Sequence, residues 1–502
     1  MSASISNTDC ERVVALLTEV SVNTSVPRTC ETDLGPIQDR LSKVLDALAS
    51  LLVSRPTKEV IAVGLQAGSS SNLCYTLTLA SNESVTRTTV GHCRRIMKHL
   101  KQLGLEFYTL RKNTCHQTAL KDMEGERADS SDMDETKFPE SLRLMVDSFK
   151  ADLHKFSMPK FRQRLNKKCG LTTRGAAFHS YVTEIPERDC PIVRRLKDIN
   201  RILSWVTNIL QEHRWEIPEN KRDIFLEGMD RISDIVREVF ETSNWKVKLA
   251  NVASAPPFPL EGFLRKISSI PNAIETLIKC AYSPRLYRRF LFEQELEVKS
   301  LRNQPRNIKL PPSNQWMEIS KQVLANSATD RSLQEEENEE NEENGKSENG
   351  KEANLPGHSL SLKLSGMDVI RAPVHCECVL ALKFLGENRT VRSVQYIGVS
   401  KLSCIGCWAF LKALRDNGIA FYTKGSHSKA YFPWKFPDLE MDWAMVPNES
   451  QTRITMSFFN NMSQIYAQRL REQKMMRKLS DSTTGSSSGT QRAWRFTMED
   501  FI

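Results

Sequence analysis

The feature that most restricts how this chain can fold is a histidine, a glutamate and four cysteines that stand close together in its last third. The first group is "HCEC" at 375–378 and the second is "SCIGC" at 403–407, and each opens an apolar run. Eight of the twelve cysteines stand singly elsewhere, which is too sparse for a disulfide framework and typical of reduced core residues. The clustered cysteines indicate a metal site or a catalytic site if the fold brings the two groups together.

Residues 357–440 alternate between strand-like and helix-like patterns. Pro373 favours the start of a helix over "CVLALKFL", and "CIGCWAFLKALRDNG" predicts a second helix that ends at Gly418. Strands are predicted at "SLSLKL" (359–364) and "DVIRA" (368–372), which form a hairpin, at "SVQYIGVS" (393–400), and at "IAFYT" and "KAYFPW" beyond the second helix. This order predicts an α/β domain in which crossover helices cover a mixed sheet.

The larger, earlier part of the chain is predicted to be mainly α-helical. Apolar residues recur at spacings of three and four from Ile192 to Leu210 and from Phe225 to Val239, and these two helices should pack as a pair. Further helices are predicted at 36–54, 90–104, 139–155, 259–281 and 314–325. This part alone indicates no activity.

An acidic run separates the two parts. Residues 334–352 contain nine glutamates against two lysines and no apolar residue, so burial cannot offset the entropy lost on ordering them. The predicted organisation is a helical region of unknown function (1–313), a candidate first helix of the α/β domain (314–326), a disordered acidic insertion (327–356), the α/β domain (357–440), a C-terminal helical extension (441–479) and a disordered tail (480–502). The helical region and the α/β domain are expected to fold separately.

The net charge is +9 although the acidic run is included, so the remainder of the chain is strongly basic. The basic residues gather in "CRRIMKHLK" (93–101), "KFRQRLNKK" (160–168), "RLYRRF" (285–290) and "QRLREQKMMRK" (468–478). Such runs on amphipathic helices are more often solvated faces than contacts with phosphate groups, so they are only a weak indication of nucleic-acid binding.

No run approaches the roughly 18 apolar residues that a membrane span requires, and "MSASISNTDCERVVALL" lacks both the basic start and the apolar stretch of a signal peptide. We therefore expect an intracellular protein, in the cytoplasm or nucleus, with no membrane partner.

The spacing of Cys404 and Cys407 places both sulfurs on one side of a helix start, where the helix dipole and a cation both favour thiolate. A crossover connection would bring His375 alongside as a third ligand, and two thiolates with an imidazole select zinc. Three protein ligands leave one position open for a water molecule. Glu377 follows His375 by two residues and can move that water's proton without binding the metal.

A closed structural site is the competing interpretation, because Cys376 and Cys378 offer two further sulfurs. That arrangement would give His375 and Glu377 no shared role, and it would require Cys378 to face a metal from within an apolar helix. We therefore favour the open site and expect Cys376 and Cys378 to be pocket or core residues.

This pattern resembles the signature of the zinc deaminases, H-x-E followed by P-C-x-x-C. The match is "HCE" at 375–377 and "SCIGC" at 403–407, with Ser403 in place of the usual proline. The longer run "YIGVSKLSCIGCWAFLKAL", continued by "GSHSKAYFPW" (425–434), resembles a lineage of deaminase-fold proteins that is expanded in fungi and related to bacterial toxin deaminases. The resemblance covers residues from about 355 to 440.

The resemblance implies hydrolytic deamination of a nucleobase, in a nucleotide or in single-stranded nucleic acid, with Zn²⁺ as cofactor and Glu377 as the catalytic residue. A zinc-stabilised interaction module that turns nothing over is the alternative. Substrate contacts are predicted at Trp408, His427, Lys429, Tyr431 and Trp434, while a plain polar turn remains an equal interpretation of "SHSK".

Overall fold

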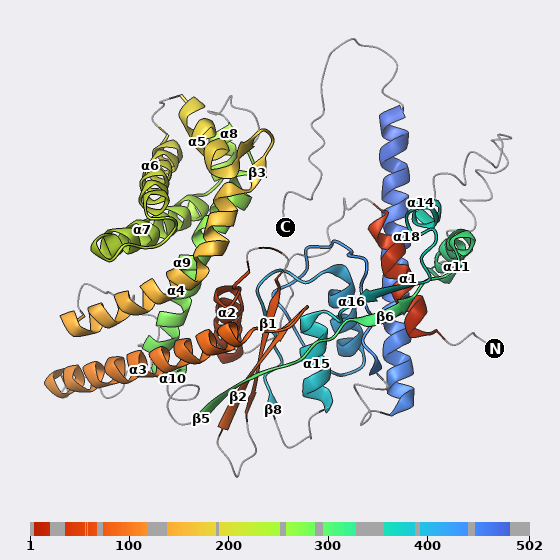
Figure 1. Ribbon diagram of the computed structural model, residues 1–502, viewed down its shortest axis with the longest axis horizontal. Helices are drawn as coiled ribbons and strands as arrows, with labels where there is room; N and C mark the ends of the chain where they lie inside the picture. Colours follow the sequence, from red (N-terminus) through yellow and green to blue (C-terminus); the bar gives the residue numbers. More distant parts are fainter. Residues whose placement is uncertain are drawn as a thin grey trace.

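The computed structural model describes residues 5–20, 36–55, 57, 59–67, 74–118, 138–186, 190–250, 258–286, 295–327, 356–386, 392–439 and 447–481. A mixed sheet lies at the centre, with helices on both sides (Figure 1). The predicted disordered insertion and tail fall almost entirely outside the described residues. Within the described part, no helix is both long enough and apolar enough to cross a membrane.

The central sheet has the strand order β5-β2-β1-β8, and β9 also pairs with β1. Its strands are β1 (Ile61–Ala67), β2 (Cys74–Ser81), β5 (Glu295–Ser300), β8 (Arg392–Ser393) and β9 (Gly398–Val399). β2 runs antiparallel to β1 and parallel to β5, while β8 and β9 run antiparallel to β1. The predicted fold class, a mixed sheet with helices and a preceding helical region, is confirmed.

Both faces of β1 are buried, so its apolar sequence is nearly continuous. Ile61, Val63 and Leu65 face the core shared with the helical region, and Ala62 faces a second core beneath the helices that carry the cysteines. Gly64 also lies on this second face, where a Cβ atom would lie 2.3 Å from the Phe384 ring. The helix that carries Phe384 can approach the strand this closely because residue 64 has no side chain.

The helical region packs on one side of the sheet (Figure 1). Its helices are α2 (Pro36–Leu51), α3 (Arg87–Thr118), α4 (Glu140–Asn166), α5 (Arg174–Glu184), α6 (Pro191–Glu212), α7 (Arg222–Glu241), α8 (Trp245–Ala250), α9 (Leu260–Tyr282) and the short α10 (Pro284–Leu286), with a small hairpin of β3 (Lys168–Cys169) and β4 (Thr172–Thr173). The residues predicted to face inward on α6 and α7 are buried, and the two helices pack together as expected.

The other side of the sheet carries the two helices that begin at the cysteine groups. They are α15 (Cys376–Gly386) and α16 (Ile405–Asp416), joined by α1 (Asn7–Thr18), α11 (Trp316–Ser327), α14 (Pro356–Lys363) and the long α18 (Asn448–Asp481). The first helix of the chain therefore packs against its last described helix, and Lys435 pairs with the buried Glu11 at 2.6 Å.

Three strand predictions are wrong. Residues 359–363 belong to helix α14 and residue 364 to the turn after it, and β7 (Val369–Ala372) pairs instead with β6 (Arg306–Lys309). The α14 backbone packs tightly on Trp316, where a Cβ at Gly357 would lie 2.6 Å from the Trp316 carbonyl oxygen. A six-residue alternating run is too short to specify a strand against such packing. "IAFYT" and "KAYFPW" form no strand; the first contributes only the isolated bridge Tyr396–Tyr422, and a second bridge, Ser403–Ser426, lies between the two segments.

The expectation of two separately folded parts also needs correction, because the central sheet takes strands from both sides of the acidic run. β1, β2 and β5 precede that run, and β8 and β9 follow it. Strands β1, β2 and β5 were not predicted, because the pattern before residue 313 was interpreted as helical alone. A boundary at residue 313 would remove three strands from the sheet that α15 covers.

Candidate metal centre

His375 lies at the start of α15, where its carbonyl oxygen accepts a hydrogen bond from the Val379 N–H at 3.0 Å. Two asparagines from distant segments fix this start. Asn82, just after β2, accepts from the Cys376 N–H at 2.9 Å, and Asn303, just after β5, donates to the Val374 carbonyl at 2.6 Å. The position of the histidine therefore depends on the strands that precede the acidic run.

Cys404 is the N-cap residue of α16, and its sulfur accepts the Cys407 N–H at 3.4 Å. The next residue, Ile405, donates its N–H to the Lys429 carbonyl at 2.9 Å, which ties the helix start to the loop that follows α16. Both sulfurs are thus at the positive end of the helix dipole, which favours their thiolate form when a cation is present.

The side chains of His375, Cys404 and Cys407 are in contact. The His375 Nδ1 atom lies 3.2 Å from the Cys407 sulfur and 3.4 Å from the Cys404 sulfur, and the two sulfurs are 3.4 Å apart. Among the described residues, these three form a group whose ligand atoms lie within 4.8 Å of one another. Two sulfurs and an imidazole nitrogen that converge in a buried place fit a metal ion of borderline softness.

Burial governs the protonation of this group. Burial raises the pKa of both Cys404 and Cys407 well above the ordinary thiol value. At His375, burial acts to lower the pKa, but the Cys404 sulfur and the Glu377 carboxylate outweigh it, and the net shift is upward. A metal ion must therefore displace protons from these groups when it binds.

The other two cysteines take no part in the group of ligand atoms described above. The Cys376 thiol is directed at its neighbour, donating to Glu377 Oε2 at 3.4 Å. Cys378 is buried in the first turn of α15 and interacts with the Cys407 sulfur. This placement favours the open three-ligand arrangement over the closed site with four sulfurs.

Glu377 lies in the first turn of α15 and is only 4% exposed. Its carboxylate contributes to the raised pKa of His375 and partly opposes the lowering of the His427 pKa by burial, so its charge acts on the metal group and on the loop after α16. Glu377 is therefore next to the ligands without being one of the grouped ligand atoms, as the proton-shuttle hypothesis requires.

Ser403 stands where the deaminase signature has proline, and the structure gives a reason. Its N–H donates to the Gly425 carbonyl at 3.0 Å, and its hydroxyl lies 3.2 Å from the Thr423 hydroxyl. Its carbonyl accepts from the His427 N–H and the Ser426 hydroxyl. Proline has no N–H to donate, so serine binds the loop more completely.

The predicted substrate contacts other than Trp408, which is on α16, lie in the segment that follows α16. His427 packs edge-on against Tyr431 with ring centroids 5.4 Å apart, and its Nδ1 accepts the Lys429 N–H at 3.1 Å. Burial lowers the pKa of His427 to about 4 and raises the pKa of Tyr431 to about 12, so both are neutral near pH 7. His427, Lys429, Tyr431 and Trp408 are all half-buried.

Trp434 was predicted to contact substrate, but its side chain is fully buried. It contacts Cys407, one of the candidate metal ligands, instead. Its indole N–H donates to the Cys407 sulfur at 3.4 Å, and its ring stacks on Phe458 of α18. From the same helix, the buried Arg469 donates to the Ser428 carbonyl. Helix α18 therefore supports Cys407, through Trp434, and also the loop that follows α16, through Ser428. No local sequence pattern indicated this role.

Comparison with known proteins agrees with this geometry. Residues 374–438, which include all three grouped residues and Glu377, match the model of the OTT_1508_deam-like deaminase family. No curated protein and no solved structure matches the chain. The matched segment thus supports a deaminase domain with a candidate metal site.

Proposed function

We propose that this protein is a zinc-dependent hydrolytic deaminase that acts on a nucleobase, in a nucleotide or in single-stranded nucleic acid. The observation that carries the proposal is the meeting of two sulfurs and an imidazole at two helix starts, with Glu377 beside them, inside a segment that matches a deaminase family. The ligand set of His375, Cys404 and Cys407 is the one that zinc deaminases use.

A bound zinc ion would supply Lewis-acid activation of a water molecule. The chain's own residues would then manage the protons. Glu377 would take a proton from the water, pass it to the ring nitrogen of the base, and later deliver a proton to the departing ammonia. The overall reaction consumes one water and converts the exocyclic amine into a carbonyl group. The neutral rings of His427 and Tyr431 would line the approach to the candidate metal centre.

The metal assignment is tested by metal analysis of purified protein, with about one zinc ion expected per chain. His375→Ala and Cys404→Ser should each lose the metal, because each removes one of three ligands. Cys376→Ala and Cys378→Ala should retain it and serve as matched controls. Retention in His375→Ala together with loss in both controls would favour the closed structural site and the non-catalytic module.

The catalytic assignment is tested with Glu377→Gln, which keeps the shape of the side chain but removes the base. We expect unchanged zinc content and folding. Ammonia release from cytosine- or adenine-containing nucleosides, nucleotides, RNA or single-stranded DNA should fall by on the order of 10²-fold or more. Undiminished activity in this variant would show that Glu377 is not the shuttle. A folded, zinc-loaded wild-type protein that deaminates nothing in the panel would make the interaction module the better explanation.

A further inference from the structure

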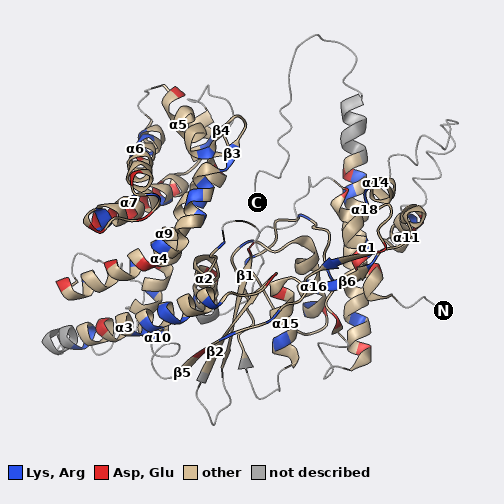
Figure 2. Ribbon diagram, in the orientation of Figure 1, with Lys and Arg blue, Asp and Glu red and all other residues tan. Residues whose placement is uncertain are grey.

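Helix α18 buries one of its arginines beside the loop that follows α16. Figure 2 shows basic residues along this helix, and Arg453 and Arg471 are exposed. Arg469 is only 1% exposed. It follows Phe458, which stacks on Trp434, by about three helical turns and therefore lies on the same face of the helix. Burial removes the hydration of a guanidinium group, which costs free energy unless other groups replace the water.

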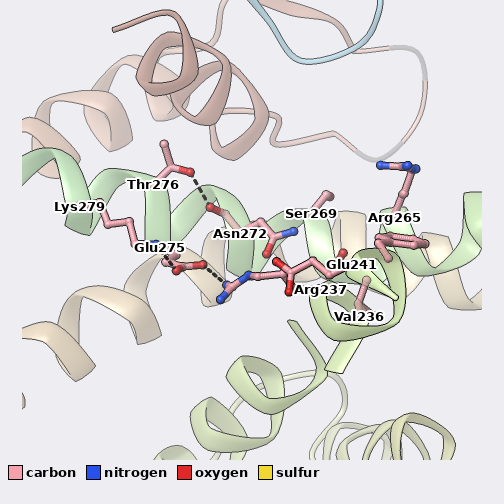
Figure 3. A pocket seen from close by; sticks show the side chains of 11 residues that line it. Val236, Arg237, Glu241, Arg265, Ser269, Asn272, Glu275, Thr276 and Lys279 are labelled. Atoms are coloured by element: carbon pink, nitrogen blue, oxygen red, sulfur yellow. Dashed lines mark hydrogen bonds and ion pairs between the residues drawn. The ribbon is translucent and has the colours of Figure 1, made fainter. Parts of the chain in front are cut away.

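The pocket between α7 and α9 provides a contrast, because there a carboxylate balances two cations (Figure 3). Glu275 pairs with Arg237 at 2.7 Å and with Lys279 at 2.6 Å. Within the described part of the chain, Arg469 has no such ion pair, and its Nε and Nη1 atoms have no hydrogen-bond partner. The charge of Glu472 acts on it and favours its cationic form.

The hydrogen bond that Arg469 does make is directed at the loop after α16. Its guanidinium donates to the carbonyl oxygen of Ser428, which is itself buried. An apolar side chain of similar size could fill the same space at a lower desolvation cost. What the guanidinium adds is therefore the fixed direction of one backbone carbonyl.

Ser428 has a backbone conformation that depends on its neighbours. Its φ angle is 63°, in the left-handed region, where the Cβ atom of a residue other than glycine crowds the following carbonyl oxygen. Its N–H donates to the Ser426 hydroxyl at 3.0 Å, and its carbonyl accepts from Arg469. Contacts on both sides of the residue therefore hold a conformation that costs free energy.

The residues on either side of Ser428 are bound to the start of α16. The His427 N–H donates to the Ser403 carbonyl at 3.1 Å, and the Lys429 carbonyl accepts from the Ile405 N–H at 2.9 Å. These two contacts lie immediately before and after Cys404 in the chain. A change in the backbone at Ser428 would therefore shift His427 relative to the candidate metal centre.

The same loop fixes which nitrogen of His427 carries a proton. The Lys429 N–H donates to His427 Nδ1 at 3.1 Å, so Nδ1 is an acceptor and carries no hydrogen. Burial lowers the pKa of His427 to about 4, so the ring is neutral near pH 7 and its one proton is on Nε2. No residue of the described chain accepts that proton. His427 therefore has one fixed and unused hydrogen-bond donor.

We propose that Arg469 is a positioning residue for base recognition: it holds Ser428 so that the Nε2–H of His427 donates to an acceptor atom of the base. The inference rests on the proposed function, since it assigns the acceptor to the base whose amine is removed beside Glu377. The ring nitrogen next to the reacting carbon receives its proton from Glu377. The acceptors left for His427 are N3 and N7 of adenine or O2 of cytosine.

The positioning role is tested by ¹⁵N NMR of the imidazole groups in the full-length protein. The His427 signals are those that disappear in His427→Phe. We expect a single tautomer with a bare Nδ1 in the wild-type protein and a mixture of both tautomers in Arg469→Met, which removes the donor to Ser428. Arg471→Met, on the exposed side of the same helix, should behave like wild type.

A protonated Nδ1 in the wild-type protein, or an unchanged tautomer in Arg469→Met, would overturn the role of Arg469. If Arg469→Met does not fold, Arg469→Gln carries the same test, because it removes the charge and shortens the side chain but remains polar.

Base recognition is tested by binding to the Glu377→Gln protein, in which turnover is blocked. The probes are 5′-monophosphates and short single-stranded oligonucleotides that contain adenine, 3-deazaadenine, 7-deazaadenine, cytosine or 2-thiocytosine as the target base. Each analogue removes or weakens one acceptor. We expect one analogue to bind about tenfold or more weakly than its parent base, because the Nε2–H is left without a partner. This difference should disappear when His427→Phe is added.

The same difference with and without His427, or no difference in a protein whose wild-type form deaminates the parent base, would overturn the inference and leave the proposed function intact. A difference that His427→Phe abolishes, in a protein whose wild-type form deaminates none of these bases, would instead overturn the proposed function and leave a base-binding site.

Discussion

At the scale of single residues, Trp434 illustrates how the candidate metal centre depends on a group outside the ligand motif. Its N–H donates to the Cys407 sulfur, and its ring is held by Phe458. Trp434→Phe keeps the aromatic packing but removes the donor. We expect zinc affinity, measured by competition with a chelator, to fall by about tenfold or more. Trp408→Phe is the control, and an equal affinity in both variants would contradict a role for the indole N–H.

The ligands themselves were predictable from the sequence, because helix-start cysteines and a histidine followed by glutamate have a chemical rationale in their spacing. The supporting residues were not. Asn82 and Asn303 anchor the His375 segment from positions hundreds or tens of residues away, and neither belongs to a pattern. The sequence predicts Trp434 as a substrate contact, but a sequence does not show whether an indole faces a substrate or a sulfur.

At the scale of elements, helix α4 contains a histidine that should make stability depend on pH. His154 is buried against Phe225 of α7, and burial with the nearby Lys150 lowers its pKa to about 3. The unfolded chain takes up a proton near pH 6.5, above the folded value. Stability should therefore fall as the pH drops from about 6.5, by roughly 2 kcal/mol at pH 5 from this group.

The measurement is the decrease in the free energy of unfolding between pH 7 and pH 5, monitored by amide hydrogen exchange in α4 and α7. His154→Gln should lose less than the wild-type protein over this interval because its side chain does not titrate. His179→Gln changes an exposed histidine of α5 and should behave like wild type. An identical loss in all three proteins would exclude His154 as the cause.

The periodic helices α6 and α7 were predicted well, because each has a long apolar face that specifies one packing surface. The short elements were not. β8 and β9 contain two residues each, and their pairing depends on β1, so the local pattern at 393–400 could not define them. Helix α14 likewise owes its form to Trp316 and not to its own alternating leucines.

At the scale of the whole molecule, the shared sheet predicts that cutting the chain will not divide it. A protease site placed within 328–355 should yield two fragments that elute together in size-exclusion chromatography, since β1 pairs with β8 and β9 across the cut. Residues 357–502 expressed alone should bind zinc poorly and fold only when residues 1–327 are co-expressed. A separately eluting, folded, zinc-binding C-terminal fragment would contradict this expectation.

The same strand order has a consequence for synthesis on the ribosome. β1 ends at residue 67, but its partners β8 and β9 begin only at residues 392 and 398. At about 5–20 residues per second, β1 waits roughly tens of seconds for them. During that interval one edge of an apolar strand has no native partner, and such edges pair readily with other chains. Production of this protein should therefore depend on chaperones that bind the nascent chain.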